Sequence, residues 1–302
     1  MAPRFTVPKG DTPPITPTSR FYVEDISGVP DYVKEGAQDW TLKVHGEVEQ
    51  PLNLDFKAIT SKPQVHETIT LSCIGNPVGG HALGNAKWQG ISLRQLLKEV
   101  DPKSDAEWMV VRAADGYHES IPLKKARHRA AMLATHMNGH RLTKDHGYPL
   151  RLLIPGLYGI KQVKWIQELE LTSKRLPGYW NKKGWTRDGR VQIFSRIDWP
   201  HQEDNLLRGY HKIRGIAFAG DRGIIRVELS FDEGKTWQLA RMEKPLSEYS
   251  WVFWNARIPL GPGHHSVMVR AADLYSGIQR GYKRDPFPEG VTGFHRIEFN
   301  VY

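Results

Sequence analysis

The sequence predicts an α+β protein of two domains: a mixed α/β domain over residues 1–190 and an all-β sandwich of immunoglobulin type over residues 191–302. The chain has 302 residues, enough for two domains of about 150 residues, each with its own core. Strand-like and helical patterns are mixed before residue 190, whereas short strands separated by turns follow it. Hydrophobic residues make up 39% and charged residues 25% of the chain, which excludes wholesale disorder and collagen-like or coiled-coil structures.

The first domain begins with an irregular segment and continues with strands and one clear helix. Residues 1–36 are rich in Pro, Thr, Gly and Asp, so we expect an arm without regular structure. Ser92 precedes a run with helical spacing that ends at Val100, and its hydroxyl is suited to cap that helix. Strands are expected at 40–46, 48–54, 67–72, 108–113, 149–154 and 163–171, and a further segment begins at Ile121.

The second domain is predicted from six short strands and the turns between them. Asp232-Glu233-Gly234-Lys235 is a turn sequence between two of these strands. The spacing of the strands is typical of an immunoglobulin-like sandwich. The strands are expected at 213–219, 224–230, 237–241, 251–258, 265–271 and 294–301.

Composition limits the classes of function. Cys73 is the only cysteine, which excludes an internal disulfide, a Cys-rich zinc site and a four-cysteine iron–sulfur cluster. Lys and Arg total 42 against 33 Asp and Glu, and the resulting charge of +9 favours anionic partners. The basic run Lys124–Arg129 has no interleaved aromatics, so we expect a solvated face and no nucleic-acid partner.

The sequence does not fix the compartment. No apolar run approaches 18 residues, so no membrane-spanning segment is expected. The first residues do not have the pattern of a targeting peptide. We therefore expect a cytoplasmic protein, or a periplasmic or otherwise extracytoplasmic one if an export signal or membrane anchor precedes these residues.

Two segments could carry chemistry. Cys73 follows a strand and leads into Ile74-Gly75-Asn76-Pro77, where glycine lets the backbone approach a ligand closely, although a lone cysteine is also a common core residue. Residues 145–165 interleave His146, Arg151, Lys161 and Lys164 with glycines. Exposed backbone N–H groups and cations together favour an anion or phosphate pocket, and a solvated basic loop is the alternative.

These two motifs, in this order and followed by an immunoglobulin-like domain, resemble the sulfite-oxidase family of molybdopterin enzymes. The resemblance extends from about Thr41 to Gln279. The segments that carry it are Cys73–Asn76, Gly84–Gly90, Asp115–Tyr117, Ser120–Leu123, Met137–Gly139, His146–Arg151, Pro155-Gly156, Val163–Trp165, Arg226–Ser230, Gly234–Trp237 and Arg270–Asp273.

The resemblance implies a molybdenum–molybdopterin cofactor and a set of site residues. Cys73 matches the family cysteine whose thiolate binds molybdenum, and a soft thiolate suits that metal. Trp185 aligns with the family's active-site tyrosine, so we expect it in the catalytic site. Cofactor contacts are expected from Tyr22, Asn76, Asp115, His146, Arg151, Lys161, Gln162 and Lys164.

The sequence departs from the family where sulfite would bind. Val78 replaces one substrate-binding arginine, Glu24 stands where another is expected, and no arginine accompanies residues 250–254. A buried dianion needs paired cations, so the sulfite site is not preserved although the cofactor site is.

The resulting hypothesis is a mononuclear molybdenum oxidoreductase that transfers an oxygen atom to or from a small substrate. Because the chain lacks a CxxCH haem motif and cluster cysteines, electrons would pass to or from an external carrier such as an acidic cytochrome. The resemblance also implies a homodimer through residues 191–302. Two alternatives stay open: a non-catalytic binding or assembly protein with the same fold, and a thiol hydrolase that uses Cys73 with His81 or His146.

Overall fold

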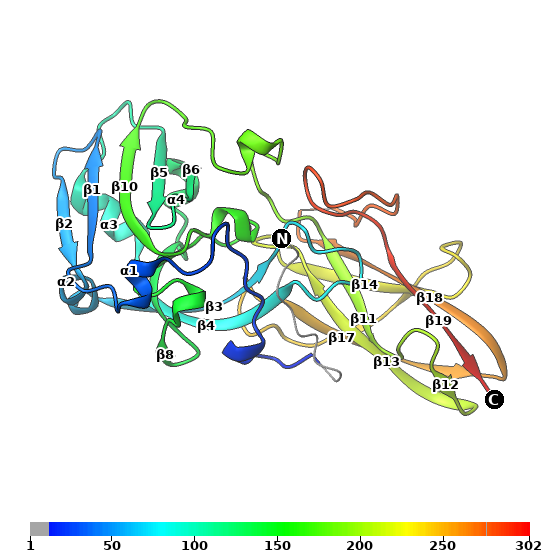
Figure 1. Cartoon of the computed structure of the whole chain (residues 1–302). Coiled ribbons are helices and arrows are strands. Elements are labelled where there is room, and N and C mark those ends of the chain that lie inside the picture. The colour runs from blue at the N-terminus through cyan, green and yellow to red at the C-terminus, as the bar shows by residue number, and fades with distance from the viewer. Residues whose placement is uncertain (1–11, 276) are drawn as a thin grey trace. The chain divides into compact units, whose positions relative to one another are not determined.

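The computed structural model describes residues 12–275 and 277–302, which form two compact units (Figure 1). Unit 1 contains Pro17–Ile69 and Ala86–Gly189. Unit 2 contains 190–302 together with 12–16 and the segment Thr70–Asn85, which carries Cys73. The chain enters unit 2 at Thr70 and again at Arg190, next to the predicted domain limit. The two-domain division itself stays a prediction, and the segment Thr70–Asn85 has no counterpart in it. Residues 1–11 of the predicted arm lie outside the described residues.

Unit 1 is built on a mixed five-stranded sheet with the order β2-β1-β10-β5-β6. Strand β1 pairs in parallel with β10 and antiparallel with β2. Leu42 and Val44 of β1 are fully buried and alternate with more exposed residues, as a strand with one face on a core requires. The strands of this sheet are β1 (Thr41–Gly46), β2 (Leu52–Asp55), β5 (Trp108–Ala113), β6 (His118–Pro122) and β10 (Ile166–Thr172). The helices of unit 1 that belong with it are α1 (Asp31–Lys34), α2 (Phe56–Ser61), α3 (Leu93–Val100) and α4 (Leu123–Ala126).

The predicted helix is confirmed as α3. The Ser92 hydroxyl accepts a hydrogen bond from the Gln95 N–H at 3.4 Å, which satisfies one free donor of the first turn. Leu93, Leu96, Leu97 and Val100 are buried in the core of unit 1, so one face of the helix supplies the packing.

A second sheet has the order β3-β4-β7-β8, with β9 paired to β7. Strands β3 and β4 contribute residues to both units, and the Cys73 loop lies between them. The remaining elements of this part of the chain are β3 (Gln64–Ser72), β4 (Leu83–Ser92), β7 (Met132–Met137), β8 (His140–Arg141), β9 (Arg151–Leu153), η1 (Thr18–Arg20), η2 (Lys144–His146), η3 (Gly159–Lys161) and η4 (Asn181–Lys183).

Unit 2 is an immunoglobulin-like sandwich, as predicted. Its sheets have the orders β11-β13-β17-β16 and β12-β19-β18-β14-β15. Their facing side chains, including Val227, Trp254 and Phe299, form one core. The strands are β11 (Phe194–Trp199), β12 (Asn205–Leu206), β13 (Gly209–Phe218), β14 (Ile224–Ser230), β15 (Gln238–Leu239), β16 (Arg241–Met242), β17 (Val252–Leu260), β18 (Gly263–Asp273) and β19 (His295–Val301).

Several elements differ from the expectation. The strand predicted at 237–241 is two short strands, because the chain passes from one sheet to the other at Ala240. Strand β4 was not predicted, since its glycines disguise the pattern. One of them, Gly90, permits a close approach: a Cβ there would lie 2.0 Å from the Leu133 carbonyl oxygen of the paired strand β7. Strands β7 and β11 were also missed.

None of the helices among the described residues combines the length and the apolar character that crossing a membrane requires.

Candidate active site

Arg151, at the start of β9, is a buried cation without a carboxylate partner among the described residues. Only 6% of the residue is exposed. Its Nη1 donates to the His146 carbonyl oxygen at 3.1 Å, its guanidinium lies 5.1 Å from the Trp88 ring centroid, and its Nε has no hydrogen-bond partner. Burial lowers the pKa of Arg151 to about 10. A buried charge normally requires a partner, so this geometry is suited to an anionic ligand.

Lys164 brings a second cation to the same place. Its Nζ donates to the Asp145 carbonyl oxygen at 2.9 Å and lies 3.8 Å from an Asp25 carboxylate oxygen. Burial and then the charge of Arg151 lower the pKa of Lys164 to about 8. Gly147, with φ +105°, permits the two cations to converge, because a Cβ there would lie 3.0 and 3.1 Å from the Cβ atoms of Arg151 and Lys164.

His146 lies beside these cations as a neutral ring. Burial and then the Arg151 charge lower the pKa of His146 to about 4. Its Nε2 donates to the Thr18 carbonyl oxygen at 3.1 Å, which leaves Nδ1 as an acceptor. The Phe21 ring packs edge-on against His146 at 5.7 Å between centroids and stacks on Tyr22 at 5.5 Å.

Asp115 completes the group. It lies in the turn between β5 and β6, where its Oδ1 accepts from the Tyr117 N–H at 3.0 Å. Burial raises the pKa of Asp115, whereas Lys164 acts in the opposite direction. Electrostatic interactions thus join Asp115 to Lys164, and Tyr22 to Arg151. We refer to Tyr22, Asp115, His146, Arg151 and Lys164 as the cation cluster.

Glu24, which stands where the resemblance leads us to expect an arginine, lies next to this cluster. Burial and then the neighbouring Asp25 raise the pKa of Glu24, while Lys164 lowers it. A carboxyl group in this place discourages an oxyanion and is compatible with a neutral or protonated group.

Lys161 and Gln162 make their polar contacts elsewhere in unit 1. The Lys161 Nζ lies 2.8 Å from a Glu119 carboxylate oxygen, and both side chains are almost completely buried. The Gln162 amide bonds the backbone of Ile154 and the carbonyl oxygen of Leu157. Both side chains therefore stabilise the loop that precedes β10, and their predicted contact with a cofactor stays a prediction.

Trp185 lies in an aromatic loop of unit 1. Its ring packs edge-on against Trp180, with 6.4 Å between centroids. Asn181 holds the loop closed, because its amide donates to the carbonyl oxygens of Trp185 and Thr186 at 3.3 and 2.6 Å. The half-buried indole is the feature that could line a substrate site.

In unit 2, the Cys73 loop begins where β3 ends. The half-buried Cys73 donates its N–H to the Ala82 carbonyl oxygen at 2.8 Å, and the Gly75 N–H points at its Sγ at 3.4 Å. An N–H dipole directed at sulfur stabilises negative charge there. The Asn76 Oδ1 accepts from the Ala82 N–H at 2.7 Å, so Asn76 closes the loop, while its buried Nδ2 has no hydrogen-bond partner.

The far side of the Cys73 loop is anchored to the sandwich. Arg196 of β11 donates from Nη1 to the Gly80 carbonyl oxygen at 2.7 Å. Gly79 fits against the His295 ring, since a Cβ there would lie 2.4 Å from two ring atoms. The thiol is therefore held by a rigid element rather than a free loop.

The described residues contain no group of three or more His, Cys, Asp or Glu side chains placed to hold a metal ion. The predicted role of Cys73 as a metal ligand stays a prediction.

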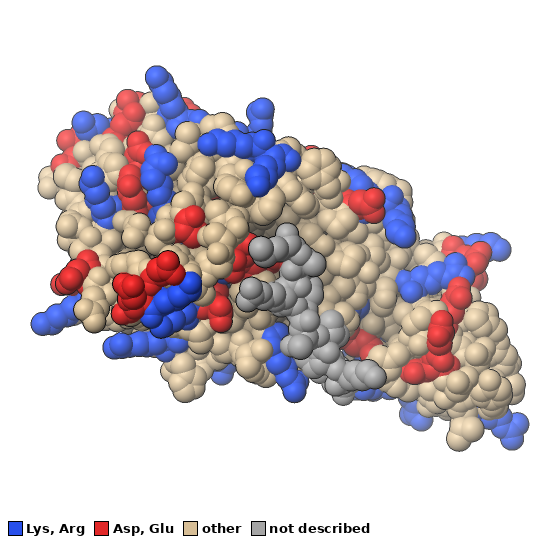
Figure 2. All heavy atoms as spheres, viewed as in Figure 1, with Lys and Arg blue, Asp and Glu red and all other residues tan. Residues whose placement is uncertain are grey.

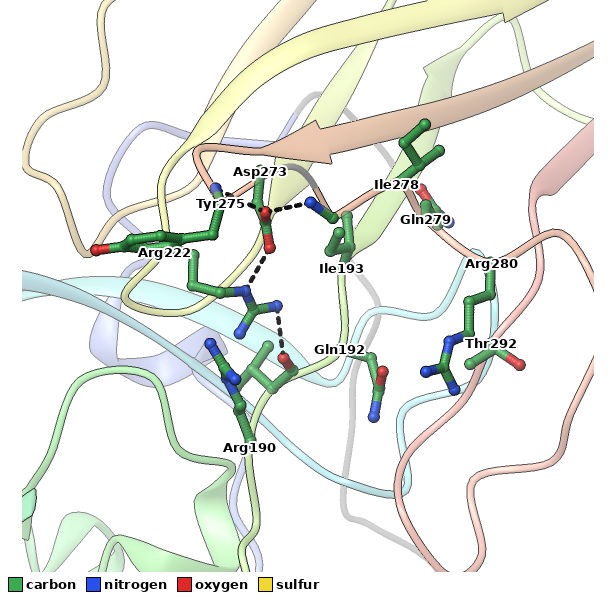
Figure 3. Close-up of a pocket in the computed structure, with 12 residues that line it drawn as sticks. Arg190, Gln192, Ile193, Arg222, Asp273, Tyr275, Ile278, Gln279, Arg280 and Thr292 are labelled. Atoms are coloured by element: carbon green, nitrogen blue, oxygen red, sulfur yellow. Dashed lines mark hydrogen bonds and ion pairs between the residues drawn. The ribbon is translucent and has the colours of Figure 1, made fainter.

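Arg222 and Asp273 of unit 2 were missed in the sequence. Their side chains form a buried ion pair in the wall of a cavity (Figure 3). The sequence could have drawn attention to Arg222 through the turn Gly220-Asp221-Arg222-Gly223 between two predicted strands. Its acidic partner Asp273, however, lies 51 residues further along the chain.

Comparisons with known proteins agree with both units. A family model for the oxidoreductase molybdopterin binding domain matches residues 27–180, and a model for the Mo-co oxidoreductase dimerisation domain matches residues 191–281. The NADPH nitrate reductase of Emericella nidulans is 30% identical over 88% of this chain and 39% of its own length. The chain thus spans about two fifths of the length of the fungal nitrate reductases that it matches.

Two further relatives match over most of their length. The sulfite oxidase of Arabidopsis thaliana is 28% identical over 88% of this chain and 82% of its own. The crystal structure of the sulfane dehydrogenase SoxCD from Paracoccus pantotrophus superimposes with a TM-score of 0.82 and 25% identity, over 95% of this chain and 83% of that one.

Proposed function

The chain belongs to the sulfite-oxidase family of molybdopterin-binding oxidoreductases, and from this premise we propose that it is a mononuclear molybdenum enzyme that transfers an oxygen atom to or from a small substrate. The observation that carries the proposal is Arg151, a buried guanidinium with a free Nε and no carboxylate partner among the described residues. Its charge suits the phosphate of a molybdopterin.

The residues fit such a cofactor on two counts. Arg151 and Lys164 converge where a phosphate would match their charge, and the neutral His146 adds a hydrogen-bonding edge without adding a third cation. Cys73 offers the single soft ligand that a metal already held by a dithiolene needs, and Gly75 supports negative charge on it.

When bound, the cofactor supplies a metal that changes oxidation state by two electrons as an oxygen atom is transferred. The protein binds and orients it. Arg151 and Lys164 would hold the phosphate, His146 and Asp115 would hydrogen-bond the pterin, and Cys73 would supply its thiolate to the metal. The buried Nδ2 of Asn76 has no partner and would be available to donate a further hydrogen bond to the cofactor.

Electrons would be exchanged with an external carrier, which we propose to be a cytochrome with an acidic docking face because the chain carries a net charge of +9. On the face in Figure 2, Lys and Arg side chains are interspersed with Asp and Glu, so the basic character there is distributed rather than gathered in one patch. We also propose a homodimer through unit 2, supported by the match to a dimerisation domain.

The decisive variant is Cys73→Ala, made in a host able to synthesise the cofactor. We expect the purified variant to keep pterin, measured by fluorescence after oxidative release, and to lose both the thiolate–molybdenum charge-transfer band and turnover with redox dyes. Ser72→Ala is the matched control, because it removes the neighbouring hydroxyl and keeps the thiol. An unchanged absorption spectrum in Cys73→Ala would contradict the assignment.

A further inference from the structure

Unit 2 contains a cavity of about 400 Å³ with a positively charged wall (Figure 3). Arg190, Arg222 and Arg280 line it, and Asp273 is the one carboxylate among its lining residues, which leaves a formal charge of +2. In the view of Figure 3, Arg190 and Arg222 are seen on one side of the cavity, and Arg280 with Thr292 on the other. A wall of this kind attracts an anion.

Arg222 is the buried component of this wall. Its residue is 8% exposed. Its Nε pairs with Asp273 and its Nη2 donates to the Val191 carbonyl oxygen at 3.0 Å, whereas its buried Nη1 has no hydrogen-bond partner. Asp273 is itself held by the N–H groups of Tyr275 and Gly277 at 3.0 and 2.9 Å. The guanidinium is thus preorganised, with one donor left for a ligand.

Two successive contacts link the cavity wall to the Cys73 loop within unit 2. Gln279, which lines the cavity, donates from Nε2 to the Gly293 carbonyl oxygen at 2.9 Å. Gly293 packs against Val78 of the Cys73 loop, since a Cβ there would lie 3.3 Å from a Val78 methyl group. Val78, which stands where the family resemblance leads us to expect an arginine, therefore makes an apolar contact with Gly293.

The size and the lining distinguish between ligand classes. A water-sized group occupies about 30 Å³, so the cavity has room for on the order of ten such groups, several times more than sulfite needs. Ile193, Ile278 and Tyr275 add apolar surface to the wall. Pockets of this size and mixed character are typical of organic ligands with one anchored polar group.

We propose that this cavity binds an organic anion, a molecule with a sulfonate or carboxylate on an apolar body. The anionic group contacts the unpartnered Nη1 of Arg222, and Arg280, on the opposite side of the cavity in Figure 3, adds positive charge that attracts it. The apolar body packs on the apolar part of the cavity wall.

The test is calorimetric titration of the purified protein with benzenesulfonate and, separately, with sulfate, on samples whose molybdenum content is measured. We expect saturable binding of benzenesulfonate at least about tenfold tighter than that of sulfate. Arg280→Ala should weaken benzenesulfonate binding severalfold, through loss of one positive charge from the cavity wall. Arg241→Ala, an exposed arginine on β16 outside the cavity, should leave it unchanged.

A second variant removes the buried charge without leaving its partner unpaired. Arg222→Gln combined with Asp273→Asn keeps groups able to hydrogen-bond, and we expect it to weaken benzenesulfonate binding about tenfold or more, a larger loss than in Arg280→Ala. Equal affinity for sulfate and benzenesulfonate, or binding unaffected by both variants, would overturn the proposal. Because the cavity contains none of the residues proposed to hold the cofactor, a molybdenum-free sample that still binds benzenesulfonate through these arginines supports the proposal.

Discussion

Arg151 and Lys161 are both buried cations of unit 1, yet only Lys161 has a carboxylate partner. A Glu119 carboxylate oxygen lies 2.8 Å from the Lys161 Nζ, whereas the guanidinium of Arg151 bonds a backbone carbonyl oxygen and has no carboxylate beside it among the described residues. A matched buried charge is complete without a ligand, and an unmatched one is stabilised when an anion arrives. The comparison teaches how to separate a structural cation from a ligand-binding one when both lie in the same motif.

The largest effect is expected where the matched pair is broken. Glu119→Gln leaves Lys161 buried without a counter-charge, and we expect the free energy of unfolding to fall by about 3–5 kcal/mol. Urea denaturation of the cofactor-free protein measures it. Glu170→Gln is the control, because its pair with Arg112 is partly exposed and contributes less than about 1 kcal/mol. A loss in Glu119→Gln no larger than in the control would contradict the structural role of Lys161.

Acid should destabilise the region of unit 1 around Arg151, because the buried neutral ring of His146 lies there. The pKa of His146 is lowered from 6.5 to about 4, so the unfolded chain binds the proton first as the pH falls. The contribution of His146 to the free energy of unfolding is therefore complete above pH 6.5 and is lost between about pH 6.5 and 4. Its magnitude is on the order of 3 kcal/mol.

Denaturation at a series of pH values tests this, with His146→Gln set against the exposed His140→Gln. His146→Gln should flatten the acid side of the stability curve, and His140→Gln should not. Curves of the same slope for His146→Gln and the native chain would count against the buried neutral imidazole.

Arg151→Met should separate ligand binding from stability. The variant removes an unmatched buried charge, so we expect the cofactor-free protein to unfold at an unchanged or higher urea concentration. Cofactor retention should fall tenfold to a hundredfold, since a charge-assisted bond to phosphate contributes about 1.5–3 kcal/mol. Pterin content after gel filtration measures it. Full retention would show that Arg151 is not a cofactor ligand.

The smallest effect is expected at Gly147. With φ +105° and the Cβ atoms of Arg151 and Lys164 at 3.0 and 3.1 Å, Gly147→Ala should cost about 1–2 kcal/mol of stability and spread the two cations. Gly36→Ala shares the positive φ, +102°, but has open space around it and is not part of the cation cluster, so it reports backbone strain alone. Equal pterin retention in the two variants would argue against the spreading.

The regular parts of the fold were predictable where one face of an element packs on a core. Alternation identified β1 and β14, and helical spacing with Ser92 identified α3. The division of the strand predicted at 237–241 into β15 and β16 could not be predicted, because a change from one sheet to the other leaves no local pattern in the sequence. The assignment of Thr70–Asn85 to unit 2 was not predicted for the same reason: it arises from long-range contacts such as Trp251 N–H to the Thr70 hydroxyl at 2.9 Å.

The candidate site was likewise predictable only in part from the sequence. The resemblance pointed to Tyr22, Asp115, His146, Arg151 and Lys164, which the structure brings together, although their cofactor contacts stay predictions. It could not reveal that Glu119 matches Lys161 or that Asp273 orients Arg222, because each pair joins segments far apart in the chain. The compartment and the electron carrier also stay predictions.

The most direct measurement is the molybdenum content of the native chain, by plasma mass spectrometry, after expression in a host that loads related enzymes. The account predicts one molybdenum per chain, and a content that falls with Arg151→Met while Glu170→Gln leaves it unchanged. A folded protein without molybdenum from that host would contradict the account and favour a non-catalytic binding protein of the same fold.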